Sequence, residues 1–200
     1  MKTIPRALRV IALAGAGVTC SIPRIHYYTL EVPHVSSQAA PENSYHVTIQ
    51  RFSADQILRD ERILYREGPH EVSFYEYHRW ASPPAELVTS YFIHRLRDSG
   101  TYARVSSYKD GPQADFILQG RLHNFEEVDR GKETLASVAL EIELLEAKTR
   151  QPIWRNEADC TRPLPGRDMA GLVDGIYGCL DETATKLLTA MHEQIRQRGK

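Results

Sequence analysis

Polar and apolar residues alternate most regularly between residues 116 and 160, where three long strands are predicted. In the middle strand one face is apolar and the other polar, which is typical of a sheet that is exposed to water on one side. The apolar positions are Ala136, Val138, Leu140, Ile142 and Leu144, and the polar ones are Ser137, Glu141 and Glu143. Turn residues at 130–132 and 148–152 separate the three segments, so we predict an antiparallel meander.

Shorter strands are predicted ahead of this meander. β-branched and aromatic residues favour an extended segment at 26–32, and alternation predicts a half-buried strand at 45–50. Residues 63–67 and 71–80 flank the turn signal Gly68 and Pro69, which predicts a hairpin. One more short strand is expected at 102–105.

Two helices complete the pattern. The first is expected to begin at Ser82, whose hydroxyl can cap free backbone amides ahead of Pro83 and Pro84, and to end at Ser99 and Gly100. The second begins near residue 168 and carries an apolar stripe about seven turns long. The stripe matches the apolar face of the sheet. The predicted fold is therefore α+β, a two-layer sandwich of an antiparallel meander sheet with two helices packed on one face.

The N-terminus has the order of a secretory signal. Three basic residues precede an apolar run at 10–18 that is too short to cross a bilayer as a helix, and Cys20 follows directly. This order resembles the lipobox of bacterial lipoproteins, in which the cysteine is acylated, although Gly17 and Thr19 depart from the usual pattern. Export with a free Cys20 and a disordered leader on a cytoplasmic protein are the alternatives. The predicted organisation is a signal peptide at 1–19, a lipidated tether with one short strand at 20–44, and a single α+β domain at 45–200.

Charge argues against nucleic acid as a partner. The chain has 25 basic and 26 acidic residues, and removal of residues 1–19 deletes three basic ones, leaving 22 against 26, a net charge of −4. The remaining basic residues are scattered, whereas nucleic-acid binding needs clustered Lys and Arg. Two further cysteines, Cys160 and Cys179, would pair in an oxidising periplasm or remain as two buried thiols, and both readings stay open.

Motifs for catalysis are missing from the sequence. It contains no Gly-x-Ser-x-Gly elbow, no phosphate-binding loop and no Cys-x-x-Cys pair. We therefore predict no catalytic residues, no metal and no cofactor. The aromatic run before the first helix is more informative, because Tyr75, Tyr77 and Trp80 exceed what one strand face can bury. They are candidates for a partner-binding surface, and the alternative is a strand-to-helix corner around a packed Trp80.

Four stretches together resemble a known family. Residues 75–84 read Tyr-Glu-Tyr-His-Arg-Trp-Ala-Ser-Pro-Pro, residues 27–30 Tyr-Tyr-Thr-Leu, residues 114–121 Ala-Asp-Phe-Ile-Leu-Gln-Gly-Arg and residues 125–127 Phe-Glu-Glu. With the leader ending in Cys20, they are similar to the ABC-type transport auxiliary lipoproteins, which include the paraquat-inducible protein C group. The resemblance extends over nearly the whole mature chain.

The resemblance implies a non-enzymatic periplasmic lipoprotein that docks to mammalian-cell-entry (MCE) domain proteins and to the ATPase and permease of an ABC transporter that moves lipids across the envelope. It transfers one site residue, Cys20, as the point of acylation. Ser21 after the cysteine implies the outer membrane by the sorting rule of enteric bacteria. Self-association of some relatives leaves a homo-oligomer open. The alternative function is a lipid carrier, whose cavity would lie among Val138, Leu140, Ile142, Leu172 and Ile176.

Overall fold

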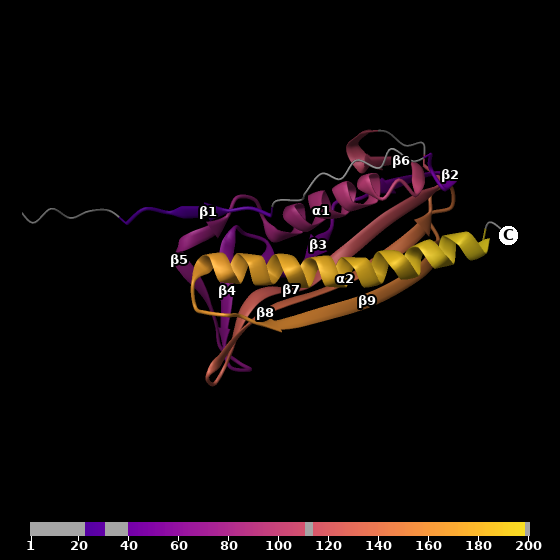
Figure 1. The fold of residues 1–200 in the computed structure, drawn as a ribbon. Helices are drawn as coiled ribbons and strands as arrows, with labels where there is room; N and C mark the ends of the chain where they lie inside the picture. The colour runs from indigo at the N-terminus through magenta and orange to yellow at the C-terminus, as the bar shows by residue number, and fades with distance from the viewer. Residues whose placement is uncertain (1–22, 31–39, 111–113, 199–200) are drawn as a thin grey trace, which may run out of the picture.

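The computed structural model describes residues 23–30, 40–110 and 114–198, and in this part of the chain nine strands form one mixed sheet against two α-helices (Figure 1). The strands are β1 (His26–Tyr28), β2 (Asn43–Ile49), β3 (Ser53–Ala54), β4 (Arg62–Glu67), β5 (Val72–Trp80), β6 (Tyr102–Ser107), β7 (Phe116–Arg130), β8 (Glu133–Glu146) and β9 (Pro152–Pro163). The helices are α1 (Pro84–Asp98) and α2 (Met169–Arg198), and short 3-10 turns lie at η1 (Gln56–Leu58) and η2 (Tyr108–Asp110).

Strand β7 is the central strand of the sheet and pairs with four other strands. Along one edge it pairs antiparallel with β8 over its full length, and β8 pairs antiparallel with β9. Along its other edge it pairs in succession with β2, β3 and β4, all parallel to it. The chain between residues 43 and 67 therefore runs alongside β7 in the same direction, and η1 connects β3 to β4.

The antiparallel meander predicted for residues 116–160 is confirmed as β7, β8 and β9, but the prediction that the whole sheet is antiparallel is wrong. β6 lies parallel to β2 and β1 lies parallel to β5, while the predicted hairpin of β4 and β5 is antiparallel. Alternation reports which face a side chain occupies but not which strand lies beside it. The coarser prediction of an α+β fold is confirmed.

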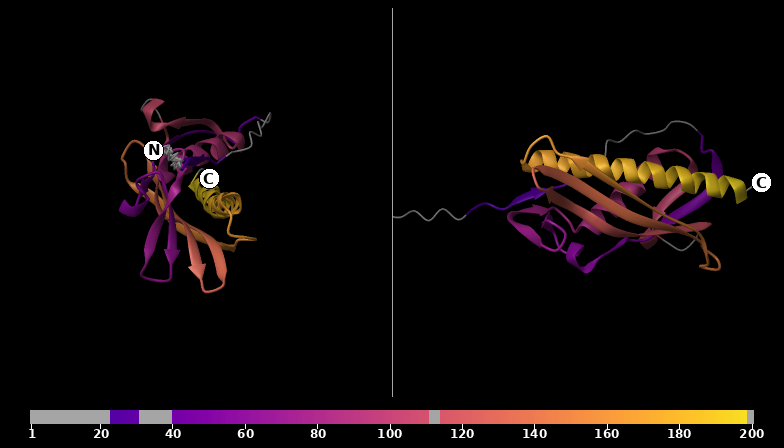
Figure 2. Two further views of the ribbon diagram at one scale, coloured as in Figure 1. Left: turned by 90° about the vertical axis from the view of Figure 1, so that its left-hand side faces the viewer. Right: turned by 90° about the horizontal axis from the view of Figure 1, so that it is seen from below.

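Both helices contact the apolar face of the sheet, which curls around them (Figure 2). On the β7 side, Phe52 packs against Phe92 of α1 with ring centroids 5.0 Å apart, and Gly120 leaves room for the Phe52 ring. On the β9 side, α2 lies over β8 and β9. The helices meet where Tyr91 donates a 2.5 Å hydrogen bond to Asp181. One continuous core results.

Some of the predicted helix ends agree with the structure and one predicted cap does not. Ser82 does not cap α1, because the helix begins at Pro84 and the carbonyl of Pro83 accepts the amide hydrogens of Glu86 and Leu87. The predicted stop after Ser99 is confirmed, and Gly100 adopts the positive φ of 65° that ends the helix. Helix α2 begins after Asp168, whose carboxylate accepts the amide hydrogen of Gly171 at 2.9 Å.

At the N-terminal end, β1 is shorter than the predicted strand at 26–32, and residues 31–39 lie outside the described residues. β1 is nevertheless part of the sheet, because its three residues pair with His78, Arg79 and Trp80 of β5. The sheet thus extends into the segment that we expected to be the tether.

Candidate interaction surfaces

The aromatic segment of β5 does not follow simple alternation. Arg62 pairs with Arg79 and Leu64 pairs with Phe74, so β5 has three more residues than β4 between these two pairs. A bulge of this kind re-aims the side chains around it. It brings the Tyr75 ring to 5.9 Å from the ring of His78, although the odd spacing of these residues would place them on opposite faces of a regular strand.

Trp80 belongs to the core. Its side chain is fully buried, and its ring centroid lies 5.0 Å from that of Phe125 on β7. The indole nitrogen has no hydrogen-bond partner among the described residues. Trp80 therefore fills the corner where β5 leads into α1 and does not reach the surface on which we expected a partner.

Tyr75 is half-buried and joins β5 to β7. Its hydroxyl donates to the Glu127 carboxylate, with its oxygen 3.1 and 3.0 Å from the two carboxylate oxygens. Burial, and then the negative charge of Glu127, raises the pKa of the Tyr75 hydroxyl well above its usual range. Burial also raises the pKa of Glu127, and the negative charge of Asp129 raises it further. The hydrogen bond from Tyr75 and the positive charge of Arg167 act in the opposite direction. The Tyr75 hydroxyl is thus committed to an internal contact.

Tyr77 is the member of the predicted set that faces solvent, with 36% of its surface exposed. A hydrogen bond from its hydroxyl to Glu76 raises the pKa of Tyr77. Two residues that our reading of the sequence missed are exposed beside β5, namely Ile25 and Tyr27 on β1 and its approach. Their place could not be read from the sequence, because only the pairing of β1 with β5 brings them beside the aromatic segment.

A histidine and tyrosine cluster fastens β1 to β5. The His26 and His78 rings stack with centroids 5.4 Å apart, and the hydroxyl of Tyr28 lies 2.9 Å from Nδ1 of His78. Partial burial, followed by the neighbouring His26, lowers the pKa of His78. A neutral His78 ring is therefore favoured, which suits its packing between the two aromatic neighbours.

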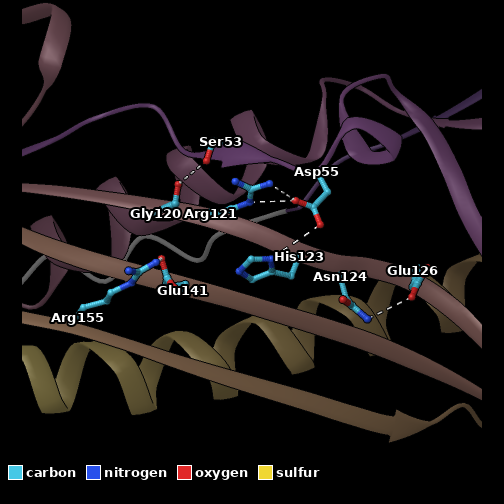
Figure 3. A network of polar contacts seen from close by, with 9 residues as sticks. All are labelled: Ser53, Asp55, Gly120, Arg121, His123, Asn124, Glu126, Glu141 and Arg155. Carbon is cyan, nitrogen blue, oxygen red and sulfur yellow. Dashed lines mark hydrogen bonds and ion pairs between the residues drawn. The ribbon is translucent and has the colours of Figure 1, made fainter.

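The opposite face of the sheet is polar, and neither helix covers it (Figure 3). Arg121 donates to Asp55 at 2.9 and 2.6 Å, and Arg155 pairs with Glu141 at 2.6 Å. Nδ1 of His123 lies 3.9 Å from the Asp55 carboxylate. The charges on this face largely neutralise one another in pairs, which is the usual state of a solvated sheet face. In the described ranges no three His, Cys, Asp or Glu residues gather in a way that could hold a metal ion.

Between the sheet and α2 lie the residues that a lipid cavity would require. All five of them are at most 1% exposed and belong to the continuous core. They are Val138, Leu140, Ile142, Leu172 and Ile176. This arrangement favours a packed core over a lipid-filled one. A cleft of about 600 Å³ lies elsewhere, between the C-terminal part of α2 and the chain around residues 42–45 and 101–102.

The two C-terminal cysteines, whose state the sequence left open, form a disulfide. It joins Cys160 on β9 to Cys179 on α2, with Cα atoms 5.1 Å apart. Both residues are buried, so the bond fastens the long helix to the edge of the sheet inside the core. Cys20, the predicted acylation site, lies outside the described residues.

The sequence matches the family model described as the ABC-type transport auxiliary lipoprotein component over residues 28–187. This match covers most of the chain. The chain belongs to the ABC-type transport auxiliary lipoprotein family. The resemblance seen in the residues of the aromatic run and of β7 is thereby confirmed, and with it the coarse function of a transport accessory lipoprotein associated with the cell envelope.

Solved structures resemble this auxiliary lipoprotein in fold. Protein XCC0632 from Xanthomonas campestris is 22% identical, with a TM-score of 0.77 over 87% of this chain and 99% of that one. The hypothetical protein CT253 from Chlamydia trachomatis is 6% identical, with a TM-score of 0.52 over 76% of this chain and 98% of that one. At these identities the likeness concerns the fold alone. The chain matched no curated protein. In the described part of this auxiliary lipoprotein, no helix is long and apolar enough to cross a membrane.

Proposed function

We propose that this auxiliary lipoprotein is exported, acylated at Cys20 and held at the periplasmic side of the outer membrane, where it serves as an accessory component of an ABC transporter with an MCE-domain partner that moves lipids. The observation that carries the proposal is the family match over residues 28–187 behind a charged and apolar leader that ends in Cys20. A leader of this order directs export, and two acyl chains on one cysteine supply stable anchoring where a single chain does not.

Two features of the folded domain support this proposal. The disulfide between Cys160 and Cys179 suits an oxidising compartment such as the periplasm, since cytosolic thiols are kept reduced. The space between sheet and helices is filled by side chains, which suits an adaptor that offers surfaces more than a carrier that encloses a lipid. The second candidate, a lipid carrier, therefore gains no support from the core.

Anchoring is tested by mass spectrometry of the mature N-terminus together with membrane fractionation. We expect a chain that begins at an acylated Cys20 and sediments with membranes. The matched control is Cys20→Ser, which should carry no acyl group because a serine cannot form the thioether to the lipid. A chain that still begins at Met1 in the soluble cytosolic fraction would overturn the proposal.

Association with a transporter is tested by affinity purification of the full-length chain from detergent-solubilised membranes of its own host. The expected result is co-purification of an MCE-domain protein and the permease with the acylated chain. Native mass spectrometry of the same preparation tests the carrier. Stoichiometric lipid bound to the Cys20→Ser domain, with no transporter subunit retained by the acylated chain, would favour the carrier instead.

A further inference from the structure

Three exposed apolar side chains gather at one edge of the sheet. Ile25 is 39% exposed, Tyr27 60% and Tyr77 36%. β1 pairs parallel with β5, so that His26 lies opposite His78 and Tyr27 lies opposite Arg79. Ile25 directly precedes β1, and Tyr77 lies two positions before Arg79 on β5. Ile25 and Tyr27 thus lie along the edge strand and Tyr77 lies on the strand beside it, and we call these three exposed residues the β1 edge patch.

The patch contains most of the exposed large apolar surface in the described part of the chain. Four large hydrophobic residues are exposed there, and three of them are in the β1 edge patch. The fourth, Tyr108, lies in η2, which follows β6 on the opposite side of the sheet order. Single exposed apolar residues are ordinary, but a contiguous group on one edge marks a contact surface.

The sheet presents this patch already formed. The backbone amide of Ala81 donates to the carbonyl of Tyr28 at 2.7 Å, which extends the β1 pairing beyond its last residue. The hydroxyl of Tyr28 lies 2.9 Å from Nδ1 of His78, and the stacked His26 ring completes the attachment. β1 is thus held in place by backbone pairing and by side chains, and its outward residues keep a defined face.

The position of the patch relative to Cys20 indicates what it contacts. Five residue steps separate Cys20 from Ile25, and an extended chain covers at most about 3.6 Å per residue, or about 18 Å in all. The headgroup layer is roughly 5–8 Å thick on each side of a bilayer, so part of this length of chain lies within it. A Cys20 whose acyl chains lie in the membrane therefore keeps Ile25 within about 18 Å of the lipid surface. By contrast, α2 is about 45 Å long at 1.5 Å per residue, and its C-terminal end lies at the other end of the domain from β1 (Figure 1).

The chemistry of the edge suits the interfacial layer of a membrane. Tyrosine places an apolar ring and a polar hydroxyl at the boundary between acyl chains and water. Arg24 is exposed and forms no ion pair with another described residue, so it is available for lipid phosphates. Glu76 is an exposed acidic neighbour on this edge.

We propose that the β1 edge patch rests in the headgroup region of the bilayer to which Cys20 is attached, and that this contact orients the domain with the C-terminal end of α2 pointing away from the membrane. The inference rests on the proposed function, because it requires acylation of Cys20. The acyl chains hold the protein at the membrane, and the patch determines which end faces it.

The test uses the acylated chain with single cysteines labelled by an environment-sensitive nitrobenzoxadiazole dye. The positions are Tyr27→Cys and Tyr77→Cys in the patch, with Tyr108→Cys as the matched control of similar exposure in η2. All three side chains are exposed, so their replacement leaves the core intact. Each protein is placed in vesicles of phosphatidylethanolamine and phosphatidylglycerol after mass spectrometry has verified the acyl group. We expect a severalfold rise in emission at positions 27 and 77, quenched by bromolipids, and no change at position 108.

Two results would overturn the proposal while leaving the anchor intact. One is an acylated, membrane-bound protein whose labels at 27 and 77 respond no more than the label at 108. The other is a response at 27 and 77 that appears only when the purified transporter is added, which would make the patch a protein interface. A chain without an acyl group in the mass spectrum would overturn the proposed function, and the orientation with it, and is recognised before any fluorescence is read. As an internal check, Ile25→Asp should reduce the emission at 77 while the protein stays in the membrane fraction.

Discussion

Breaking the bond between Cys160 and Cys179 should lower the stability of the domain substantially. The two residues are separated by 19 positions in the sequence, so the bond closes a loop of roughly 20 residues in the unfolded chain. The loop-entropy relation gives about 3 kcal/mol for a loop of this length at 25 °C. The bond joins β9, which has β8 as its strand neighbour, to α2, so its loss also weakens the hold of the helix on the edge of the sheet.

Urea unfolding of the Cys20→Ser domain, with and without a reductant, measures this loss on an unchanged sequence. With a urea slope of about 2 kcal/mol per molar, 3 kcal/mol corresponds to a fall of about 1.5 M in the unfolding midpoint. The double variant Cys160→Ala with Cys179→Ala is the control, and reductant should not move its midpoint. Equal midpoints for the oxidised and reduced wild-type chains would refute the reasoning, as would free thiols at both positions in the untreated protein.

Three further changes probe packing and pH dependence. Trp80→Ala removes a fully buried ring from beside Phe125 and should cost about 3–5 kcal/mol of unfolding free energy in urea titrations, whereas a loss under about 1 kcal/mol would contradict a core position. Gly120→Ala would place a Cβ 2.6 Å from a ring carbon of Phe52 and 2.8 Å from the backbone oxygen of Glu141, so it should cost about 1–3 kcal/mol, and an unchanged urea midpoint would contradict this close packing. The pKa of Glu127 is raised in the folded state, so its ionisation destabilises the fold as the pH rises above the ordinary value of 4.5. The Tm of the wild-type protein should therefore fall with rising pH in that range, relative to the Tm of Glu127→Gln. Parallel Tm profiles of the two proteins would contradict this.

The elements with the clearest periodicity were predictable because their pattern is local. The alternation in β8 assigned Val138, Leu140 and Ile142 to the buried face, and the structure places them there. The apolar stripe of α2 was visible in the sequence for the same reason, since residues on one helix face recur within a few positions. Turn signals such as the glycine after Ser99 ended α1 where expected.

The candidate site was only partly predictable, because its residues come from separate parts of the chain. Of the three aromatic residues of interest, Tyr77 is exposed, whereas Trp80 lies in the core and the hydroxyl of Tyr75 bonds to Glu127. The bulge in β5 interrupts the alternation of these side chains. Its position depends on the partner strand β4, so it could not be predicted from the residues of β5 alone. Tyr27 was overlooked since its importance depends on its neighbours across β5.

The sequence by itself determined the leader ending in Cys20, the faces of the long strands and the apolar stripe of the last helix, because these are properties of contiguous residues. Only the tertiary structure decided that β2, β3 and β4 run parallel to β7, that Cys160 pairs with Cys179, and that β1 with its exposed Tyr27 lies beside β5. Such contacts join segments that are far apart in the chain. Their geometry is set by the competition of all strands and helices for the same core, which periodicity within one segment does not record.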